Sequence, residues 1–364
     1  MTIKKIVLTG GGTAGHVTPN IALLPALAES GFEPHYIGSH TGIERGLIEP
    51  HGIPYYGISS GKLRRYMDLK NVSDIFRVVR GVKDAVKVLR RIKPDVVFSK
   101  GGFVTVPVAV AARMRGVPVI LHESDITPGL ANRLVLPFSR AVCCNFPETA
   151  EKLEKAVVTG TPIRAELWEG RKIEGLRLCG FDKLEAKPVI LFMGGSQGAV
   201  AINRKVVELL PQLQKRFHVI HLCGKGNMTT PPSPGYAPFE YANETLPHLL
   251  AAAEMVVSRA GANTIFELLA LNKPNLLIPL TLAASRGDQI LNAVSFEKQG
   301  FSMVLQEDEI EKSLYASIEK LYADRRDYVR NMSHGKSGTS TKNDRDGTKR
   351  VMEVIERWTT DKKP

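Results

Sequence analysis

The chain has 364 residues, of which 43% are hydrophobic and 24% are charged, and this composition is typical of a globular protein and excludes a disordered one. A chain of this length is expected to form two domains. Its formal net charge of +12 predicts an acidic partner or surface.

The four cysteines lack C-x-x-C spacing and neighbouring pairs of histidines. This spacing argues against a disulfide framework or a zinc site and predicts buried thiols in a reducing compartment. No apolar stretch reaches the ~18 residues of a membrane span, and the first residues lack the apolar region of a signal peptide. We therefore expect a cytoplasmic protein that does not cross a membrane but can lie on one.

Short apolar segments alternate with helical periods in the first half of the chain, which predicts parallel βαβ units. Helices are expected over Ile21–Ser30 and Asp74–Ile92. The expected strands are Lys5–Thr9, His35–Gly38, Val96–Ser99, Val117–His122 and Ala141–Cys144.

The second half begins at Pro188, where the apolar strand of VILFMGGSQGA runs into glycines. The further expected elements are the strands His218–Leu222, Met255–Ser258 and Asn275–Pro279 and the helices Asn263–Leu271 and Asp288–Lys298. We interpret Thr159–Lys187 as a linker and Ser333–Gly347 as a flexible polar segment before a final amphipathic helix, Thr348–Trp358. The expected fold class is α/β, with two Rossmann-like domains whose parallel sheets face a cleft.

The stretch Ile6–Asn20, IVLTGGGTAGHVTPN, places a glycine-rich loop between a strand and the start of a helix. This order directs backbone N–H groups and a helix N-terminus toward an anion. His16 follows the loop directly, which indicates either acid–base chemistry or a cap at the helix start. The glycines also match the dinucleotide pattern G-x-G-x-x-G. The second strand, however, ends in Ile37–His40 without the carboxylate that would hold a nicotinamide ribose, and the next carboxylate is Glu44.

A second glycine turn, in SRAGANTIFELLA (Ser258–Ala270), precedes a helix that is expected to begin near Ala262. Glu267 on this helix could accept two hydrogen bonds from a ribose diol, while the helix N-terminus attracts a diphosphate. Arg259 is expected to supply a fixed positive charge there. The alternative is a surface glutamate on an ordinary helix. Ser285–Gln289 opens the next helix and brings amide and carboxylate groups to the same edge of the sheet.

Seven sequence boxes occur in the order and spacing of one known family. They are GGGTAGH (Gly10–His16), SKGGFVTVP (Ser99–Pro107), HESDITPGLAN (His122–Asn132), GTPIR (Gly160–Arg164), GGSQGA (Gly194–Ala199), RAGANTIFE (Arg259–Glu267) and RGDQILNA (Arg286–Ala293). On these boxes the chain resembles the MurG family, the peptidoglycan N-acetylglucosaminyltransferases that convert lipid I to lipid II. The resemblance runs from the first strand to about Glu311.

The resemblance implies the GT-B fold. Residues 1–162 are expected to form an acceptor-binding and membrane-associating domain, and residues 163–340 a UDP-sugar-binding domain. Residues 341–364 are expected to form a helix that returns to the first domain. The implied reaction is an inverting, metal-independent transfer of GlcNAc from UDP-GlcNAc to the MurNAc 4-hydroxyl of lipid I (undecaprenyl-diphospho-MurNAc-pentapeptide). It would take place at the cytoplasmic face of the membrane and need no cofactor.

Residue roles are also implied by position in the family boxes. Glu267 is expected to hold the uridine ribose, the backbone near Ala242 to meet the uracil, and Gln289 to bind the GlcNAc hydroxyls. The residues expected along the donor, chiefly near its phosphates, are Ser196, Arg164 and the turn Thr13, Ala14 and Gly15. The loops at Gly10–Gly15 and Gly101–Gly102 are expected to bind the acceptor diphosphate. Backbone N–H groups, the helix N-terminus near Ala262 and Arg164 would stabilise the leaving group.

An inverting transfer needs a general base near the acceptor hydroxyl. His16 is the best candidate because imidazoles titrate near neutral pH, and Glu123 and Asp125 are the alternatives. Three positions depart from the family pattern. Ala14 stands where glycine is usual, which disfavours a positive φ, and Asp288 stands where many members have glutamine. Asp125 replaces the typical asparagine near the donor sugar, and a carboxylate accepts hydrogen bonds but cannot donate them.

The segment Lys62–Lys93 contains eleven Lys or Arg residues and three Asp residues, a net charge of +8. An apolar stripe at helical spacing is expected to face the core, and it consists of Ile75, Val78, Val79, Val82, Val86 and Leu89. Arg77, Arg80, Lys87 and Arg91 fall on the opposite face, and Phe76 lies off the stripe between Lys83 and Lys87. An aromatic ring among lysines fits the surface of an anionic bilayer, and the alternative is a solvated basic helix.

Two other classes of protein remain open on the sequence. Another GT-B enzyme, such as a diacylglycerol glycosyltransferase or a UDP-GlcNAc 2-epimerase, would share the ribose glutamate and the glycine loops but not the HESD and GGF boxes together. A non-enzymatic nucleic-acid binder is suggested only by the net charge. No zinc spacing, helix-turn-helix or aromatic–basic RNA motif supports it, so we expect no nucleic-acid partner.

Overall fold

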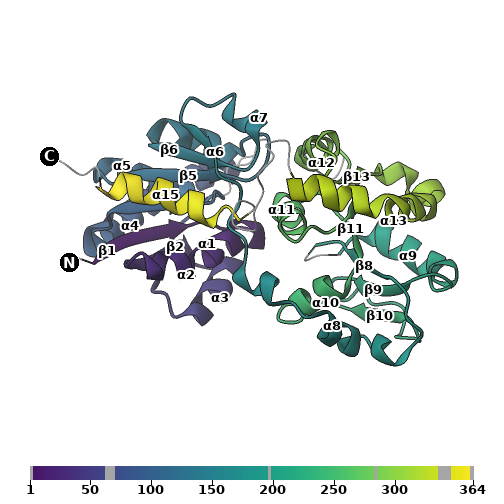
Figure 1. The fold of residues 1–364 in the computed structure, drawn as a ribbon. Helices are drawn as coiled ribbons and strands as arrows, with labels where there is room; N and C mark the ends of the chain where they lie inside the picture. Colours follow the sequence, from purple (N-terminus) through teal and green to yellow (C-terminus); the bar gives the residue numbers. More distant parts are fainter. Residues whose placement is uncertain (1–2, 62–69, 196–197, 283–284, 335–345, 361–364) are drawn as a thin grey trace. The chain divides into compact units, whose positions relative to one another are not determined.

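The computed structural model describes residues 3–61, 70–195, 198–282, 285–334 and 346–360. The chain divides into two compact units (Figure 1). Unit 1 combines Met1–Arg164 with Asp346–Pro364, and unit 2 is Ala165–Arg345. Each unit contains one sheet in which every pairing is parallel, so the expected α/β class is confirmed.

Unit 1 holds a seven-stranded sheet in the order β3-β2-β1-β4-β5-β6-β7. Its strands are β1 (Lys4–Thr9), β2 (Phe32–Ser39), β3 (Tyr55–Ile58), β4 (Val96–Ser99), β5 (Val119–Glu123), β6 (Ala141–Cys144) and β7 (Ala156–Val158). Its helices are α1 (Thr18–Ala22), α2 (Leu24–Glu29), α3 (Ile43–Ile48), α4 (Lys70–Ile92), α5 (Thr105–Met114), α6 (Leu130–Val135), α7 (Pro147–Ala150) and α15 (Thr348–Thr360). The two predicted strands Val96–Ser99 and Ala141–Cys144 have the observed bounds.

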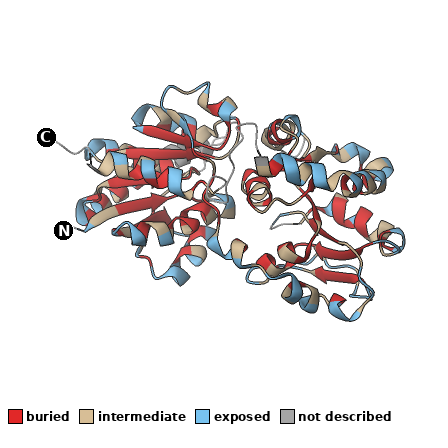
Figure 2. Ribbon diagram, in the orientation of Figure 1, coloured by how far each residue is buried: buried red, intermediate tan, exposed pale blue. Residues whose placement is uncertain are grey.

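Helices cover both faces of the unit 1 sheet because successive side chains of its strands point to opposite faces. Ile6 and Leu8 of β1 pack with residues of α1, α2 and α15. Val7, between them, packs with residues of α4 and α5 on the other face. Figure 2 shows the central strands β4, β5 and β6 as buried, and every residue of these three strands is buried. Strands buried on both faces need a continuous apolar run, which is why these strands were recognisable in the sequence.

The helix expected over Ile21–Ser30 is broken in the structure into α1 and α2. Pro25 lies in the first turn of α2. Because proline has no N–H and its ring clashes with the preceding helical turn, it disfavours the interior of a helix but is tolerated at a new start. The single predicted helix was therefore wrong at Leu23.

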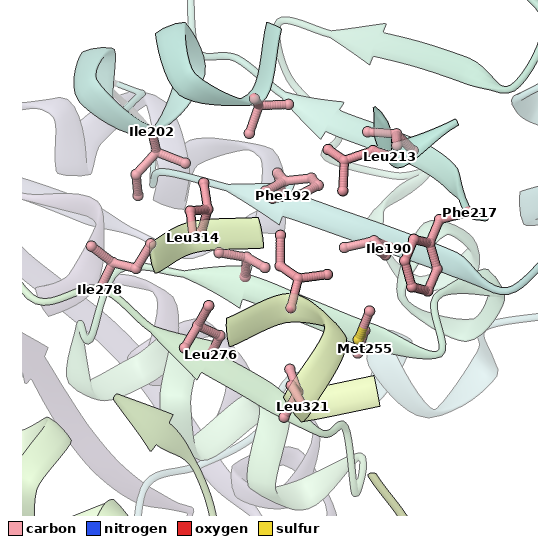
Figure 3. Close-up of a cluster of buried hydrophobic side chains, with 14 of the residues drawn as sticks. Ile190, Phe192, Ile202, Leu213, Phe217, Met255, Leu276, Ile278, Leu314 and Leu321 are labelled. Carbon is pink, nitrogen blue, oxygen red and sulfur yellow. The ribbon is translucent and has the colours of Figure 1, made fainter. Parts of the chain in front are cut away.

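Unit 2 holds a six-stranded sheet in the order β10-β9-β8-β11-β12-β13. Its strands are β8 (Val189–Met193), β9 (His218–Leu222), β10 (Tyr236–Phe239), β11 (Met255–Ser258), β12 (Asn275–Leu277) and β13 (Met303–Val304). Its helices are α8 (Lys172–Leu178), α9 (Val200–Leu213), α10 (Leu246–Ala252), α11 (Ala262–Ala270), α12 (Asp288–Lys298) and α13 (Ile310–His334). One face of the sheet packs against α9 and α13, and Ile190, Phe192 and Leu314 lie in this core (Figure 3).

The segment Thr159–Lys187, which we interpreted as a linker, is folded over part of its length. It contains the short 3₁₀ helix Ala165–Glu169 and α8, and both pack on α10 of unit 2. Gly175 makes this contact possible, because a Cβ there would lie 2.1 Å from the carbonyl oxygen of His248. A segment with few apolar residues can thus be folded when its glycines let two backbones approach.

The final helix occurs where the sequence predicts it, as α15, and it packs on α2, β4 and β6 of unit 1. Two hydrogen bonds join the residues before α15 to the end of the segment Met1–Arg164. The N–H of Gly347 donates to the carbonyl oxygen of Thr161 (3.0 Å), and that of Ile163 donates to Asp346 Oδ1 (3.0 Å). The polar segment Ser333–Gly347 lies mostly outside the described residues.

Among the described residues no helix combines the length and apolarity needed to span a membrane. The four cysteines are free thiols. Cys143, Cys144 and Cys223 are buried as predicted, whereas Cys179 is only partly buried.

Candidate active site

Both sheets reverse their strand order at one point, between β1 and β4 in unit 1 and between β8 and β11 in unit 2. Open parallel sheets bind ligands beyond the carboxyl ends of their strands at such a point. The glycine loops predicted from the sequence follow these same four strands. Each unit therefore has one candidate binding edge, and the expected site residues can be located on it.

The two glycine loops of unit 1 are packed against each other. The N–H of Gly11 donates to the carbonyl oxygen of Gly101 (3.3 Å). Gly102 has φ +87°, and a Cβ at this residue would lie 2.2 Å from the carbonyl oxygen of Gly11. Gly102 is therefore required both for its left-handed backbone and for the space it leaves.

We expect Gly102→Ala to destabilise unit 1 by about 1–2 kcal/mol from the left-handed backbone and by about 1–3 kcal/mol more from overpacking. Gly116→Ala is the matched control, because Gly116 also has positive φ (+68°) but a Cβ there would have no atom within 4 Å. Denaturant unfolding of the two variants measures the difference. Equal losses of stability would show that the loops can separate at no cost.

His16 ends the 3₁₀ turn Ala14–His16 that follows the first loop. Its Nδ1 lies 2.9 Å from the carbonyl oxygen of Gly11 and 3.2 Å from the Thr13 hydroxyl. A carbonyl oxygen can only accept a hydrogen bond, so Nδ1 of the neutral ring carries the hydrogen and Nε2 carries the lone pair. The loop thus fixes the tautomer that a general base needs. Ala14 takes the place of the usual glycine without strain, because only Lys93 and Asn272 among the described non-glycine residues have positive φ.

Glu44 is a buried carboxylate beneath the glycine loop, and no pattern in the sequence indicated its position. Its Oε1 accepts hydrogen bonds from the Ser39 N–H (2.8 Å) and hydroxyl (2.5 Å), and its Oε2 lies 3.4 Å from the Gly12 nitrogen. Glu44 therefore joins the end of β2 to the loop after β1. This is a structural role and not the ribose contact of a dinucleotide site.

A buried cation lies at the carboxyl end of β4. Lys100 is 2% exposed, and its Nζ donates to His122 Nδ1 (2.7 Å) and to Ser124 Oγ (2.7 Å). His122 Nε2 lies 3.0 Å from the carbonyl oxygen of Gly160, so this nitrogen carries the hydrogen of a neutral ring. Burial lowers the pKa of Lys100 to about 7, and Glu123 and Asp125 oppose that shift. Burial and the neighbouring Lys100 hold the pKa of His122 well below its ordinary value.

Glu123, an alternative candidate for the base, organises the loop that follows β5. Its Oε1 accepts the Asp125 N–H (3.1 Å), and its Oε2 accepts the Gly129 N–H (3.0 Å) and the Asn132 amide (2.8 Å). Only 5% of Glu123 is exposed, and its pKa is raised chiefly by burial. The geometry therefore favours a structural role for Glu123 over proton transfer. Asp125, the other alternative, is partly exposed on the same loop.

In unit 2, Arg259 follows β11 as expected, but its charge is already paired. The guanidinium forms an ion pair with Glu307 and donates to the carbonyl oxygens of Ile278 (3.2 Å) and Pro279 (3.4 Å). Its side chain is 11% exposed. Arg259 thus ties β11 to the ends of neighbouring strands. The positive charge expected at this position is therefore fixed in place and shared with Glu307.

Glu267 and Gln289 lie on the two helices that follow β11 and β12. Glu267 is partly exposed on α11. Gln289 is in the first turn of α12, and its Oε1 accepts the N–H of Leu280 (3.1 Å). Because the backbone N–H can only donate, the side-chain amide is oriented with its NH₂ group as the donor for a ligand.

The remaining expected site residues are scattered over the chain. Ala242 is buried between β10 and α10. Arg164 is the last residue of unit 1 before unit 2 begins, and Thr13 and Gly15 are exposed on the loop after β1. Ser196 lies outside the described residues.

Models of two protein domains match this chain. The glycosyltransferase family 28 N-terminal domain matches residues 6–144, and the glycosyltransferase family 28 C-terminal domain matches residues 189–351. A UDP-N-acetylglucosamine–N-acetylmuramyl-(pentapeptide) pyrophosphoryl-undecaprenol N-acetylglucosamine transferase of Clostridium botulinum is 56% identical, over 98% of this chain and 100% of the relative. The protein of the same name from Lachnospira eligens is 61% identical, over 91% and 94%.

Two solved structures illustrate the fold. MurG of Acinetobacter baumannii has a TM-score of 0.73 at 22% identity and covers 97% of this chain and 99% of its own. The UDP-GlcNAc 2-epimerase of Neisseria meningitidis, bound to UDP-GlcNAc, has a TM-score of 0.66 at 15% identity, with 97% and 100% covered. The two parallel sheets, each with a Rossmann strand order, define the GT-B fold of glycosyltransferases. Together with the domain matches and the relatives, they place the chain in glycosyltransferase family 28, and within that family it belongs to the MurG transferases.

Proposed function

We propose that the protein transfers GlcNAc from UDP-GlcNAc to the MurNAc 4-hydroxyl of lipid I, with inversion, to form lipid II for peptidoglycan. The observation that carries this proposal is the 56% identity, across nearly the whole chain, to a relative named for that transfer. The proposed donor-binding residues on unit 2 are Glu267 for the ribose, Ala242 for the uracil and Gln289 for the GlcNAc hydroxyls.

The proposed acceptor-binding edge is on unit 1. The tautomer of His16 supports its role as the base that removes the proton of the 4-hydroxyl, and Asp125 remains the alternative. The Gly11–Gly102 contact keeps two loops of backbone N–H groups together for the acceptor diphosphate. Arg164, Ser196 and the turn at Thr13–Gly15 are proposed to meet the donor phosphates, and Arg259 is proposed to keep the loop after β11 in position.

Mass spectrometry of the lipid product tests the proposal. With UDP-GlcNAc and lipid I, we expect a product heavier than lipid I by one N-acetylhexosamine residue. Digestion and linkage analysis should locate the added sugar on the MurNAc 4-hydroxyl in the β configuration. A product with the sugar elsewhere would contradict the proposed acceptor.

We also propose that α4 places the protein on the cytoplasmic face of an anionic membrane. The structure corrects one part of the stripe predicted to face the core. Val79, expected in the core, is 51% exposed, and Phe76 is 72% exposed. Leu89 is buried as expected, together with Ala85. Ile75 lies among the residues whose side chains are not described.

The exposed apolar residues of α4 lie among cations. At about 100° per residue, Phe76, Val79, Arg80, Lys83 and Lys87 fall on a single arc of the helix, and all five are exposed. Gly81 lets α4 approach the backbone at Ser59 closely, since a Cβ at Gly81 would lie 2.0 Å from the carbonyl oxygen of Ser59. An apolar pair ringed by Lys and Arg is the composition of an interfacial helix, and such a surface would bring the enzyme to its lipid acceptor.

Replacing Arg80, Lys83 and Lys87 together by glutamate should abolish co-sedimentation with anionic liposomes. Each basic residue near the surface contributes about 1 kcal/mol of attraction, and reversal adds repulsion. The same replacements at Lys298, Lys312 and Lys320, which are exposed on α12 and α13, change the net charge equally and should leave much of the binding. Activity on a short-chain, water-soluble acceptor should survive in both variants. Wild-type protein that ignores anionic liposomes at low salt would refute this proposal.

A further inference from the structure

A pocket of about 370 Å³ lies in unit 2 at the edge of the sheet opposite to the glycine loops. Its residues come from the start of α8, the end of α10, the turns before β11 and β12, and the second half of α13. Glu254 directly precedes β11, and Lys273 and Pro274 directly precede β12. These are the amino ends of the strands, whereas UDP-GlcNAc is proposed to bind at the carboxyl ends. The pocket is therefore separate from the proposed donor site, and its volume is within the usual range for small-molecule ligands.

Four cations and one carboxylate line this pocket. They are Lys172, Lys273, Arg325, Arg326 and Glu254. Lys172 pairs with Glu254 at 3.4 Å. The lining therefore carries an excess of three positive charges. Within the part of the chain that the structure describes, Arg326 has no hydrogen-bond or ion-pair partner, so this excess is not cancelled by a neighbouring carboxylate.

Two of these cations are held in place by the protein. Lys273 is partly buried, and its Nζ donates to the carbonyl oxygen of Ala253 (2.7 Å). Arg325 donates to the carbonyl oxygen of Tyr322 (2.6 Å), and its guanidinium lies over the Tyr322 ring with its carbon 4.0 Å from the centroid. Because a guanidinium has five N–H donors, Arg325 keeps donors for a ligand while its plane is fixed.

The wall that carries Lys172 is also rigid. Gly170 and Gly175 flank it in sequence, and a Cβ on either residue would lie 2.2 or 2.1 Å from a carbonyl oxygen of α10. The N–H of Arg171 donates to His248 Nδ1 of the same helix (3.0 Å). The start of α8 is thus fixed against α10, which supplies the neighbouring wall of the pocket.

We propose that this pocket binds a small anion that carries two linked phosphate groups. A single phosphate group carries only about −1.5 to −2 at pH 7, less than the three excess positive charges of the lining. Arginines with fixed planes suit phosphate oxygens because they can donate two parallel hydrogen bonds. Asn272 also lines the pocket, and its buried Oδ1 lacks a hydrogen-bond partner among the described residues. The chemistry is that of inorganic diphosphate or of a nucleoside diphosphate.

The protonation of Lys273 gives the site a diagnostic pH dependence. Burial and the nearby Lys172 lower the pKa of Lys273 to about 8, and Glu254 opposes the shift. Arg325 and Arg326, from α13, stay charged over this range. A bound anion favours the protonated amine, so binding should weaken as the pH rises through about 8. Pyrophosphate itself gains negative charge on the same rise, so the ligand alone would give the opposite trend.

Isothermal titration calorimetry on the full chain, with UDP-GlcNAc present at saturation, tests the proposal. The unit 1 loops are themselves proposed to bind a diphosphate, so the pocket is identified as the pyrophosphate site whose affinity depends on Arg326. This site should bind pyrophosphate at pH 7 and several-fold more weakly at pH 9. Lys273→Met and Arg326→Gln should each weaken binding by about tenfold or more, because each removes a charge-assisted contact. Lys320→Gln removes an exposed cation of α13 outside the pocket and should leave the affinity unchanged.

Further measurements identify the class of ligand and show whether binding depends on the residues of the pocket. Tighter binding of ADP than of pyrophosphate would indicate a nucleoside diphosphate, and the reverse order would indicate the inorganic ion. In Lys273→Met the weakening of binding at high pH should disappear, and only the opposite trend of the ligand should remain. Because Arg326 is exposed, Arg326→Gln keeps the test valid if Lys273→Met fails to fold. Absence of pyrophosphate binding, or equal affinity of Arg326→Gln and wild type, would overturn the proposal without affecting the proposed transfer.

Discussion

His16→Ala is expected to lower kcat by ~10²-fold or more while leaving donor binding nearly intact, because general-base catalysis contributes about this much. The structure supports this expectation through the hydrogen bond between Nδ1 and the Gly11 carbonyl, which sets the tautomer. A base must be unprotonated to act, so activity of the wild type should fall toward acid pH. Steady-state kinetics over a range of pH should show that this acid limb is missing in the variant.

Asp125→Asn is the comparison variant, since Asp125 is the alternative base. If His16 is the base, Asp125→Asn should keep the acid limb, although its activity can change through contacts with the donor sugar. An acid limb that persists in His16→Ala and vanishes in Asp125→Asn would assign proton removal to Asp125.

Glu267→Ala is expected to lower kcat/KM for UDP-GlcNAc by about ten- to a hundredfold. The loss corresponds to hydrogen bonds from a ribose diol to a charged carboxylate, which contribute roughly 1.5–3 kcal/mol. The circular dichroism spectrum should remain native, because Glu267 is partly exposed whereas its neighbours Phe266 and Leu268 are buried.

Glu297→Ala is the matched control, because Glu297 is exposed near the end of the neighbouring helix α12. It should leave kcat/KM unchanged. Unaltered KM and kcat in Glu267→Ala would remove this residue from the donor site and leave the ribose without its proposed partner.

The buried strands were the most predictable part of the fold. His218–Leu222 and Met255–Ser258 have the bounds that were predicted, because strands covered on both faces are mostly apolar. The strands at the outer positions of the sheets were missed. β3 (Tyr55–Ile58) contains a glycine and follows a proline, and β13 (Met303–Val304) has only two residues, so neither has a periodic pattern to recognise.

The candidate site was predictable where its residues are neighbours in sequence. The loop Gly10–Gly15 and His16 form one continuous motif, and the structure keeps them together. The ion pair of Arg259 could not be predicted in this way, because its partner Glu307 comes 48 residues later in the chain. The role of Glu44 could not be predicted for the same reason, since its contact with the Gly12 loop depends on how α3 packs against β2 and the 3₁₀ turn Ala14–His16.

The charge of a segment was easier to predict than the direction of its side chains. The basic composition of α4 was evident, but Val79 was assigned to the core because apolar residues are ordinarily buried. The periodicity near Val78–Val79 allows either residue to face inward, and the close approach of Gly81 to Ser59 decides the rotation of the helix. Such a contact between distant segments has no signature in the local sequence.

The most direct test of the central claim is acceptor-dependent release of UDP from UDP-GlcNAc. Three reactions should be compared, with a water-soluble lipid I analogue, with diacylglycerol and with no acceptor. We predict rapid UDP release only in the reaction that contains the lipid I analogue. One equivalent of GlcNAc should be transferred to the analogue for each UDP released. UDP release that is equally fast with diacylglycerol, or conversion of UDP-GlcNAc to its 2-epimer without an acceptor, would contradict the proposed function.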